Sequence, residues 1–199
     1  KANNNVAVGD SALGTNSTGA SNTALGSAAL FGNTSASNNT AVGKDALATN
    51  STGTQNNGFG VNALTANTTG DFNCAFGTNS LSSNTTADNN TAIGVNSLLA
   101  NQTGTNNTCI GRDAGLNVSS GSNNLLLGHD AGTGNAPSGT VNNENNFVCL
   151  GDNNISNAHI KVAFTTGSDK RDKTDIEDFK FGLDWVNKMR PVTYRWDNR

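Results

Sequence analysis

Apolar and polar positions recur along the first three quarters of the chain in a strict repeat, with equivalent residues at every seventeenth position. A glycine marks each period, and the residue before it is apolar in every copy. The glycines are Gly9, Gly26, Gly43, Gly60, Gly77, Gly94, Gly111 and Gly128, preceded by Val8, Leu25, Val42, Phe59, Phe76, Ile93, Ile110 and Leu127. A ninth copy ends at Gly151, after a six-residue insertion near residues 135–146. The unbroken period predicts a fold built from one repeated structural unit.

Three more columns of equivalent residues accompany the glycines. Asn stands four residues before the Gly (Asn5, Asn22, Asn39, Asn56, Asn73, Asn90, Asn107, Asn124) and seven after it (Asn16, Asn33, Asn50, Asn67, Asn84, Asn101). Leu stands four residues after it (Leu13, Leu30, Leu47, Leu64, Leu81, Leu98) and is replaced in the last copies by Gly115 and Gly132. Identical amides stacked in register can form hydrogen-bonded ladders, so we expect both Asn columns to be structural.

A period of this length is too short for a pair of helices, and the segments between turn residues are about 4 or 5 residues long, which is strand length. The repeat therefore predicts a β-solenoid with one coil per period. Coils stacked at the inter-strand spacing of ~4.8 Å give a rod of about 40 Å for eight coils.

Strand alternation places the residues three and one before each Gly on one face and the Ala between them on the other. We expect the apolar residue before the Gly, the Leu after it and an Ala to form a narrow interior, and the Gly to permit a corner with positive φ or a close approach of the backbone. Such a core is thin for one chain, which favours several chains sharing it under cyclic symmetry.

The composition fits a thin repetitive β structure. Hydrophobic residues make up 34% of the chain and charged residues 14%, with a net charge of −3. Disordered chains are usually rich in charge, so the low charge argues against disorder. The chain has no apolar run near ~20 residues and no basic excess, and we therefore expect neither membrane insertion nor nucleic-acid binding.

Candidate ligands for a metal or cofactor are sparse in the sequence. His129 and His159 stand apart, and the three cysteines have neither disulfide nor zinc-site spacing. The recurrent residues Asp10, Asp45, Asp113 and Asp130 follow the repeat glycines, where we expect solvated or turn-capping roles. We predict no metal and no cofactor.

The chemistry of the chain changes before Ser168. Residues 1–167 contain 12 charged side chains, whereas residues 168–199 contain 15, together with both tryptophans and the single tyrosine. We therefore predict a solenoid over residues 1–151, a connecting segment over 152–167 and a second domain from residue 168.

The repeat resembles known families in segments such as Asn39–Gly43 and Asn90–Gly94, which read Asn-Thr-Ala-Val/Ile-Gly. Similar repeats occur in the heads of trimeric autotransporter adhesins and in bacteriophage tail fibres. The resemblance implies a left-handed parallel β-roll with three chains side by side, forming a rigid shaft or head.

The C-terminal segment resembles the start of the α+β intramolecular chaperone domain of phage tailspikes and fibres, the endosialidase-type self-cleaving family. The agreement lies in Thr166–Ile176 and in Gly182–Trp196, with Ser-Asp-x-Arg, Asp-Ile, Gly-Leu-Asp and Arg-Pro-Val in order. The resemblance implies a catalytic pair, Ser168 and Lys173, that cuts the chain once. A Lys can act as the base that a Ser nucleophile needs when its surroundings favour the neutral amine.

Together these observations predict a homotrimeric viral fibre, located on the virion, that attaches to a host surface receptor such as a glycan. Its partners are two identical chains and other virion or fibre proteins. A bacterial trimeric autotransporter-type adhesin is an alternative. Another is an ice- or glycan-binding solenoid that uses an exposed hydroxyl column (Thr18, Ser35, Thr52, Thr69, Thr86, Thr103, Ser120). No paired carboxylates indicate a glycan-cleaving enzyme.

Overall fold

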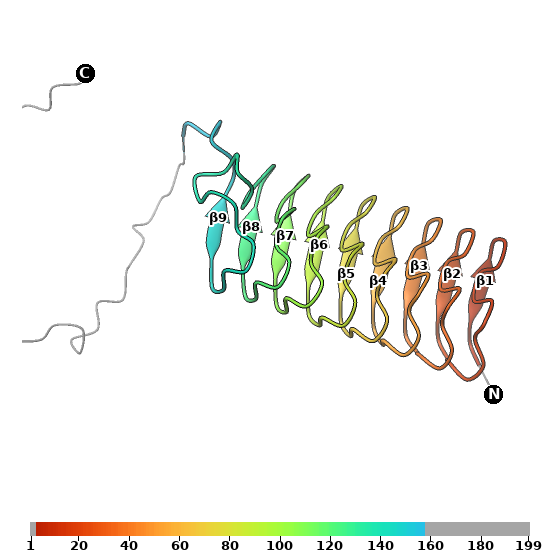
Figure 1. Ribbon diagram of the computed structural model, residues 1–199. Coiled ribbons are helices and arrows are strands. Elements are labelled where there is room, and N and C mark those ends of the chain that lie inside the picture. The colour runs from red at the N-terminus through yellow and green to blue at the C-terminus, as the bar shows by residue number, and fades with distance from the viewer. Residues whose placement is uncertain (1–2, 158–199) are drawn as a thin grey trace, which may run out of the picture. The chain divides into compact units, whose positions relative to one another are not determined.

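The computed structural model describes residues 3–157, which lie within one compact unit, Lys1–Ala158. These residues form nine short strands: β1 (Val6–Val8), β2 (Thr23–Leu25), β3 (Thr40–Val42), β4 (Asn57–Phe59), β5 (Cys74–Phe76), β6 (Thr91–Ile93), β7 (Thr108–Ile110), β8 (Leu125–Leu127) and β9 (Val148–Leu150). The strands make one sheet in chain order, and every pair is parallel. Figure 1 shows one strand per coil along the stack. The predicted all-β parallel β-solenoid is confirmed.

The register of the sheet follows the sequence period. Val8 pairs with Leu25, the equivalent residue of the next copy, and the same offset joins each successive pair as far as β8. The offset between β8 and β9 is longer, since Leu127 pairs with Leu150. The chain therefore absorbs its insertion in the connection before β9 and keeps the strand register.

Each strand has three residues, one or two fewer than expected, because left-handed backbone bounds it on both sides. Gly43 follows β3 with φ +133°, and Asn38, two residues before β3, has φ +62°. A Cβ on Gly43 would lie 2.5 Å from the carbonyl oxygen of Gly60 in the next coil. The predicted corner role of the repeat glycine is therefore confirmed, and close approach of the next coil demands glycine as much as φ does.

The interior of the solenoid differs from the prediction. The central residue of each strand, which is Ala in five of the nine, points inward, as Ala41 and Ala92 do with no exposed surface, and Leu47 and Leu64 are equally buried. The residue before the Gly lies outside instead, so the expectation that it fills the interior is wrong. Each coil encloses only enough space for one Leu and small residues, and bulky side chains therefore take the outer face of the strand.

The Asn column before the strands is structural, as predicted, but it bonds to backbone. The side-chain oxygen of Asn39 accepts from the backbone N–H of Asn56 in the next coil at 2.8 Å, and its amide group donates to the carbonyl of Gly53 at 2.8 Å. The same two bonds recur along the column, and its side chains are fully buried from Asn22 to Asn107. This column therefore ties successive coils together at a fixed height.

The second Asn column forms a true amide ladder. The amide of Asn67 donates to the side-chain oxygen of Asn50 at 2.8 Å, and the amide of Asn84 donates to Asn67 at 2.8 Å. Each amide also donates to the backbone carbonyl three residues on, such as Gly70 at 3.0 Å. The ladder ends at Asn101, whose side-chain oxygen is buried without a partner because Val118 stands one period later.

In the last coils of the core, small residues stand at the Leu positions and a large residue stands at an Ala position. Gly115 and Gly132 replace the Leu column at positive φ (+64° and +76°), the left-handed conformation that Leu98 also adopts at φ +50°. A Cβ on Gly132 would lie 2.8 Å from a methyl carbon of Leu126, which occupies the position that Ala holds in earlier coils. The bulk of Leu126 therefore compensates for the two missing leucines.

Candidate functional site

The outer face of the sheet presents a continuous apolar column, which we define as the nine residues that directly precede the repeat glycines. Its members are Val8, Leu25, Val42, Phe59, Phe76, Ile93, Ile110, Leu127 and Leu150. Six of them are between 38% and 56% exposed. The rings of Phe59 and Phe76 stack with centroids 5.5 Å apart. Sequence reasoning found this column but assigned it to the wrong side of the strand.

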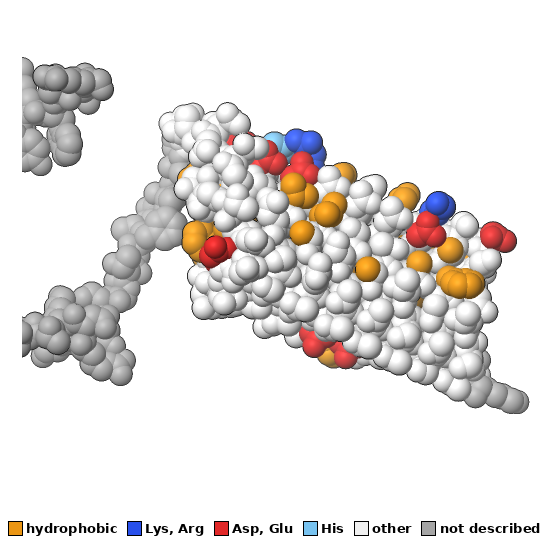
Figure 2. Space-filling model, viewed as in Figure 1, with side chains coloured by type: hydrophobic (Ala, Val, Ile, Leu, Met, Phe, Trp, Pro, Cys, Tyr) orange, Lys and Arg blue, Asp and Glu red, His pale blue; other side chains and the backbone are white. Residues whose placement is uncertain are grey.

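Charged side chains are few on the described surface, and in Figure 2 they gather mainly along the edges of the rod. Many belong to the two residues that follow each repeat Gly, such as Asp10, Lys44 and Asp45. The expected turn role of these Asp residues is supported by their backbone, because Asp45, Asp113 and Asp130 all have positive φ. The hydroxyl column from Thr18 to Ser120 is likewise exposed on the rod.

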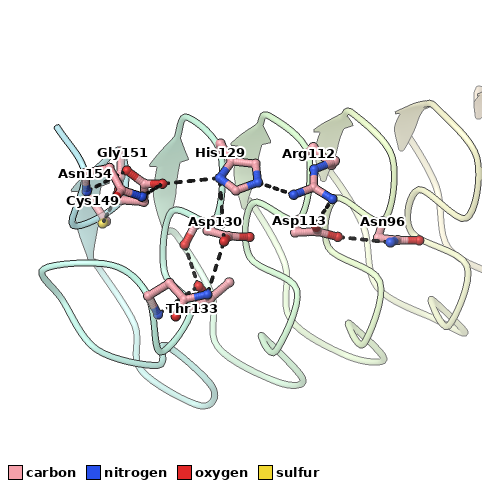
Figure 3. Close-up of polar contacts among 11 residues, drawn as sticks. Asn96, Arg112, Asp113, His129, Asp130, Thr133, Cys149, Gly151 and Asn154 are labelled. Carbon is pink, nitrogen blue, oxygen red and sulfur yellow. Dashed lines mark hydrogen bonds and ion pairs between the residues drawn. The ribbon is translucent and has the colours of Figure 1, made fainter.

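At the last coils, charged groups cluster at the corner formed by the residues that follow the repeat glycines, drawn in Figure 3. Nδ1 of His129 lies 3.3 Å from a carboxylate oxygen of Asp152 and 3.5 Å from one of Asp130. Arg112 pairs with Asp113 at 3.3 Å, and its guanidinium also contacts Nε2 of His129. The expectation that His129 stands alone is therefore wrong, since the stacking of coils brings together residues 17 and 23 positions apart.

Hydrogen bonds around Asp152 favour its ionised carboxylate. The side-chain amide of Asn154 donates to it at 3.0 Å, the backbone N–H of Asn154 at 3.0 Å, and His129 contributes a third contact. In that order of importance, these contacts lower the pKa of Asp152. The carboxylate of Asp152 therefore fixes the turn after β9 against the coil below.

Asp113, His129 and Asp130 place one potential metal-ligating atom each within 4.8 Å of one another. Other groups already use these atoms. Arg112 supplies positive charge beside Asp113, and Asn96 and Asn135 donate to Asp113 and Asp130 at 3.0 and 3.2 Å. Contacts among the described residues thus pair these three side chains with neighbouring groups in the last coils.

The inserted loop before β9 is anchored to the coil beneath it. The hydroxyl of Ser119 donates to the side chains of Asn142 and Asn143, each at 2.8 Å, and the backbone N–H of Ser122 donates to Asn145 at 2.7 Å. Residues 142–146 are all exposed. The loop therefore presents a polar amide-rich surface held in a fixed position.

The cysteines behave as small core residues in two of three positions. Cys109 and Cys149 are buried in the inward-facing column that is Ala in most earlier coils, and Cys74 is half-buried on the outer face of β5. Burial raises the pKa of the Cys109 thiol. Such a thiol stays protonated and inert at neutral pH.

The predicted catalytic pair, Ser168 and Lys173, lies outside the described residues. Among residues 3–157, no helix offers a long apolar span suited to crossing a bilayer. The described surface also has no pocket.

Comparison with known proteins bears on the C-terminal segment alone. No curated protein and no solved structure matches the chain. Residues 168–199 match a family model described as the chaperone of endosialidase. The resemblance found in the sequence is thus confirmed for this segment, which begins at the predicted boundary, Ser168. The chain combines a parallel β-solenoid with a C-terminal segment, residues 168–199, that matches the chaperone of endosialidase.

Proposed function

We propose that the chain is part of a homotrimeric viral fibre, in which the solenoid forms a rigid shaft or head on the virion. The observation that carries the proposal is the match of residues 168–199 to a chaperone family directly downstream of a regular solenoid. A solenoid of parallel coils is a stiff spacer, because every coil is hydrogen-bonded to its neighbours along the stack.

The C-terminal module would set the register in which the solenoids of different chains associate. Successive coils are nearly equivalent, so two chains can associate in any register that differs by a whole number of coils. Slipped registers bury similar surfaces and differ little in energy. A trimerising module at residues 168–199 sets the three chains level at one end before the shafts associate.

Self-cleavage at Ser168 would release this module after assembly. Lys173 accepts the proton of the Ser168 hydroxyl, whose oxygen attacks the carbonyl carbon of the scissile peptide bond. One water is consumed overall, and a carboxylate and an amine form at the new ends. Loss of the module after folding removes the template for refolding, so the shaft becomes kinetically trapped.

Contact with a host receptor, such as a surface glycan, is assigned to the loop of residues 135–146. The exposed amides of residues 142–146 can donate to and accept from glycan hydroxyls. Anchoring by Ser119 and Ser122 reduces the entropy lost when the loop binds a ligand.

The test is the intact mass, under denaturing conditions, of the full-length product of the gene. We expect wild-type chains to be cut at Ser168, and Ser168→Ala and Lys173→Ala to remain whole. Lys188→Ala is the matched control and should be cut normally, because it removes the same kind of side chain far along the sequence from the pair. Cleavage that persists in either Ser168→Ala or Lys173→Ala would overturn the catalytic assignment.

A further inference from the structure

The apolar column on the outer face of β1 to β9 has no partner within the described part of the chain. All nine positions are apolar, although the strand already buries its Ala column inward. The column has one apolar side chain in every coil, and members such as Leu25 (47%) and Phe76 (56%) are well exposed. A contiguous exposed apolar surface of this kind usually marks an interface.

The neighbouring outer columns are different in kind. The column two residues earlier in each strand is mixed, with Thr or Asn in five of its nine positions and Val, Cys or Leu in the other four, and the column after each Gly includes Asp10, Lys44 and Arg112. Apolar character is therefore maintained through every copy at one outer position only. The folding of a single chain does not require these positions to be apolar, because their side chains lie outside the core.

We infer that this column is where copies of the chain meet, side by side and in parallel, along the axis of the trimer. The inference rests on the proposed trimer and names the residues that form its interface. A partner must offer an apolar stripe that runs along about eight inter-strand steps, or ~38 Å, with the same spacing. A second copy of the chain carries such a stripe, and the column holds no charge that would repel its own copy.

Three-fold symmetry places identical residues at the same height around the axis. Each coil then contributes one layer of three apolar side chains, and most layers contain Val, Leu or Ile. Phe59 and Phe76, on β4 and β5, make two adjacent aromatic layers. A slip of one coil between two chains would set Phe59 of one level with Phe76 of the other, and it would place the remaining Phe of each chain beside Ile93 or Val42. The aromatic pair therefore adds a small preference for the correct register to the alignment that the C-terminal module sets.

The experiment uses variants of the full-length product that carry one introduced cysteine, cross-linked by a short bismaleimide; Cys109 and Cys149 are buried and stay in place. Cys74 is first changed to Ser because it lies on the same outer face. Ile93→Cys should give a covalent dimer in high yield, since two of the three thiols at one height are joined. Phe72→Cys is the control: Phe72 is 51% exposed but precedes β5, outside the column. We expect at least a tenfold lower yield from it.

A second pair of variants tests the same face by charge. Ile93→Lys with Ile110→Lys places six ammonium groups in two layers at the axis, and we expect light scattering to shift from trimer to monomer. Phe72→Lys should remain trimeric. A wild-type product that is monomeric would overturn the proposed trimer itself. A wild-type trimer that cross-links through Phe72→Cys but not Ile93→Cys, or that survives both lysines, would overturn only the assignment of the interface.

Discussion

The buried amide ladder gives the sharpest test of how the coils are held together. Asn67 sits inside the ladder, and Asn101 sits at its end. Both side chains are fully buried, so truncation of either to Ala removes the same atoms from the same kind of site. The two variants differ in the hydrogen bonds that they leave unmade.

Asn67→Ala removes the donor to Asn50 and the acceptor of Asn84, and it adds an unpaired buried oxygen at Asn50 to the one already present at Asn101. Asn101→Ala leaves the oxygen of Asn84 unpaired in the same way, but it also removes the unpaired oxygen of Asn101 itself. An unpaired buried acceptor costs ~1–3 kcal/mol. Asn67→Ala should therefore lower the free energy of unfolding by about 1–3 kcal/mol more than Asn101→Ala.

The assay is equilibrium urea unfolding followed by circular dichroism, at one chain concentration for both variants and on a Ser168→Ala background, which keeps the module needed for refolding. Equal m-values would show that the two transitions expose similar surface. Equal losses of stability, or a larger loss in Asn101→Ala, would refute the reasoning that the ladder ends unsatisfied at Asn101.

Three further predictions follow from the core, the corner and the charge cluster. Leu64→Ala should cost about 2–5 kcal/mol because Leu64 is fully buried, whereas Val61→Ala, at a position 43% exposed, should cost little; urea unfolding compares them. Gly60→Ala should lower the melting temperature strongly, since its Cβ would lie 2.5 Å from the carbonyl oxygen of Gly77 and its φ is +137°, while Gly134→Ala, whose Cβ would make only an ordinary 3.5 Å contact with the Thr140 hydroxyl, should retain most of the stability. The pKa of Asp152 is lowered in the fold, so its stabilising effect is present above the ordinary Asp pKa of about 3.9 and is lost as pH falls through the folded value; Asp152→Asn should flatten this part of the stability curve measured by acid titration, and an unchanged curve would contradict the role of Asn154 and His129.

Much of the fold could be predicted because the sequence period fixes the register in which the strands pair. Once Gly43 and Gly60 are equivalent, their strands must pair at an offset of one period, and the Asn columns must stack. The compositional change before Ser168 similarly marked the boundary at which the family match begins.

The side of the strand that faces inward could not be predicted from alternation alone. Alternation separates Ala41 from Val42 but does not say which of them is enclosed, and hydrophobicity favours the wrong one. The cross-section of the coil decides, because one Leu and small residues already fill it. The charge cluster could be predicted only in part: Arg112 and His129 are one period apart, but Asp152 joins them only because the insertion of six residues leaves the strand register intact.

The proposed assembly is one shaft of three chains from which the C-terminal module has been removed. Native mass spectrometry of the full-length product measures both the number of chains and their length. We expect an assembly of three copies of the chain cut at Ser168, with each copy lacking the module. A species with the mass of one copy would show a monomer and overturn the proposed trimer.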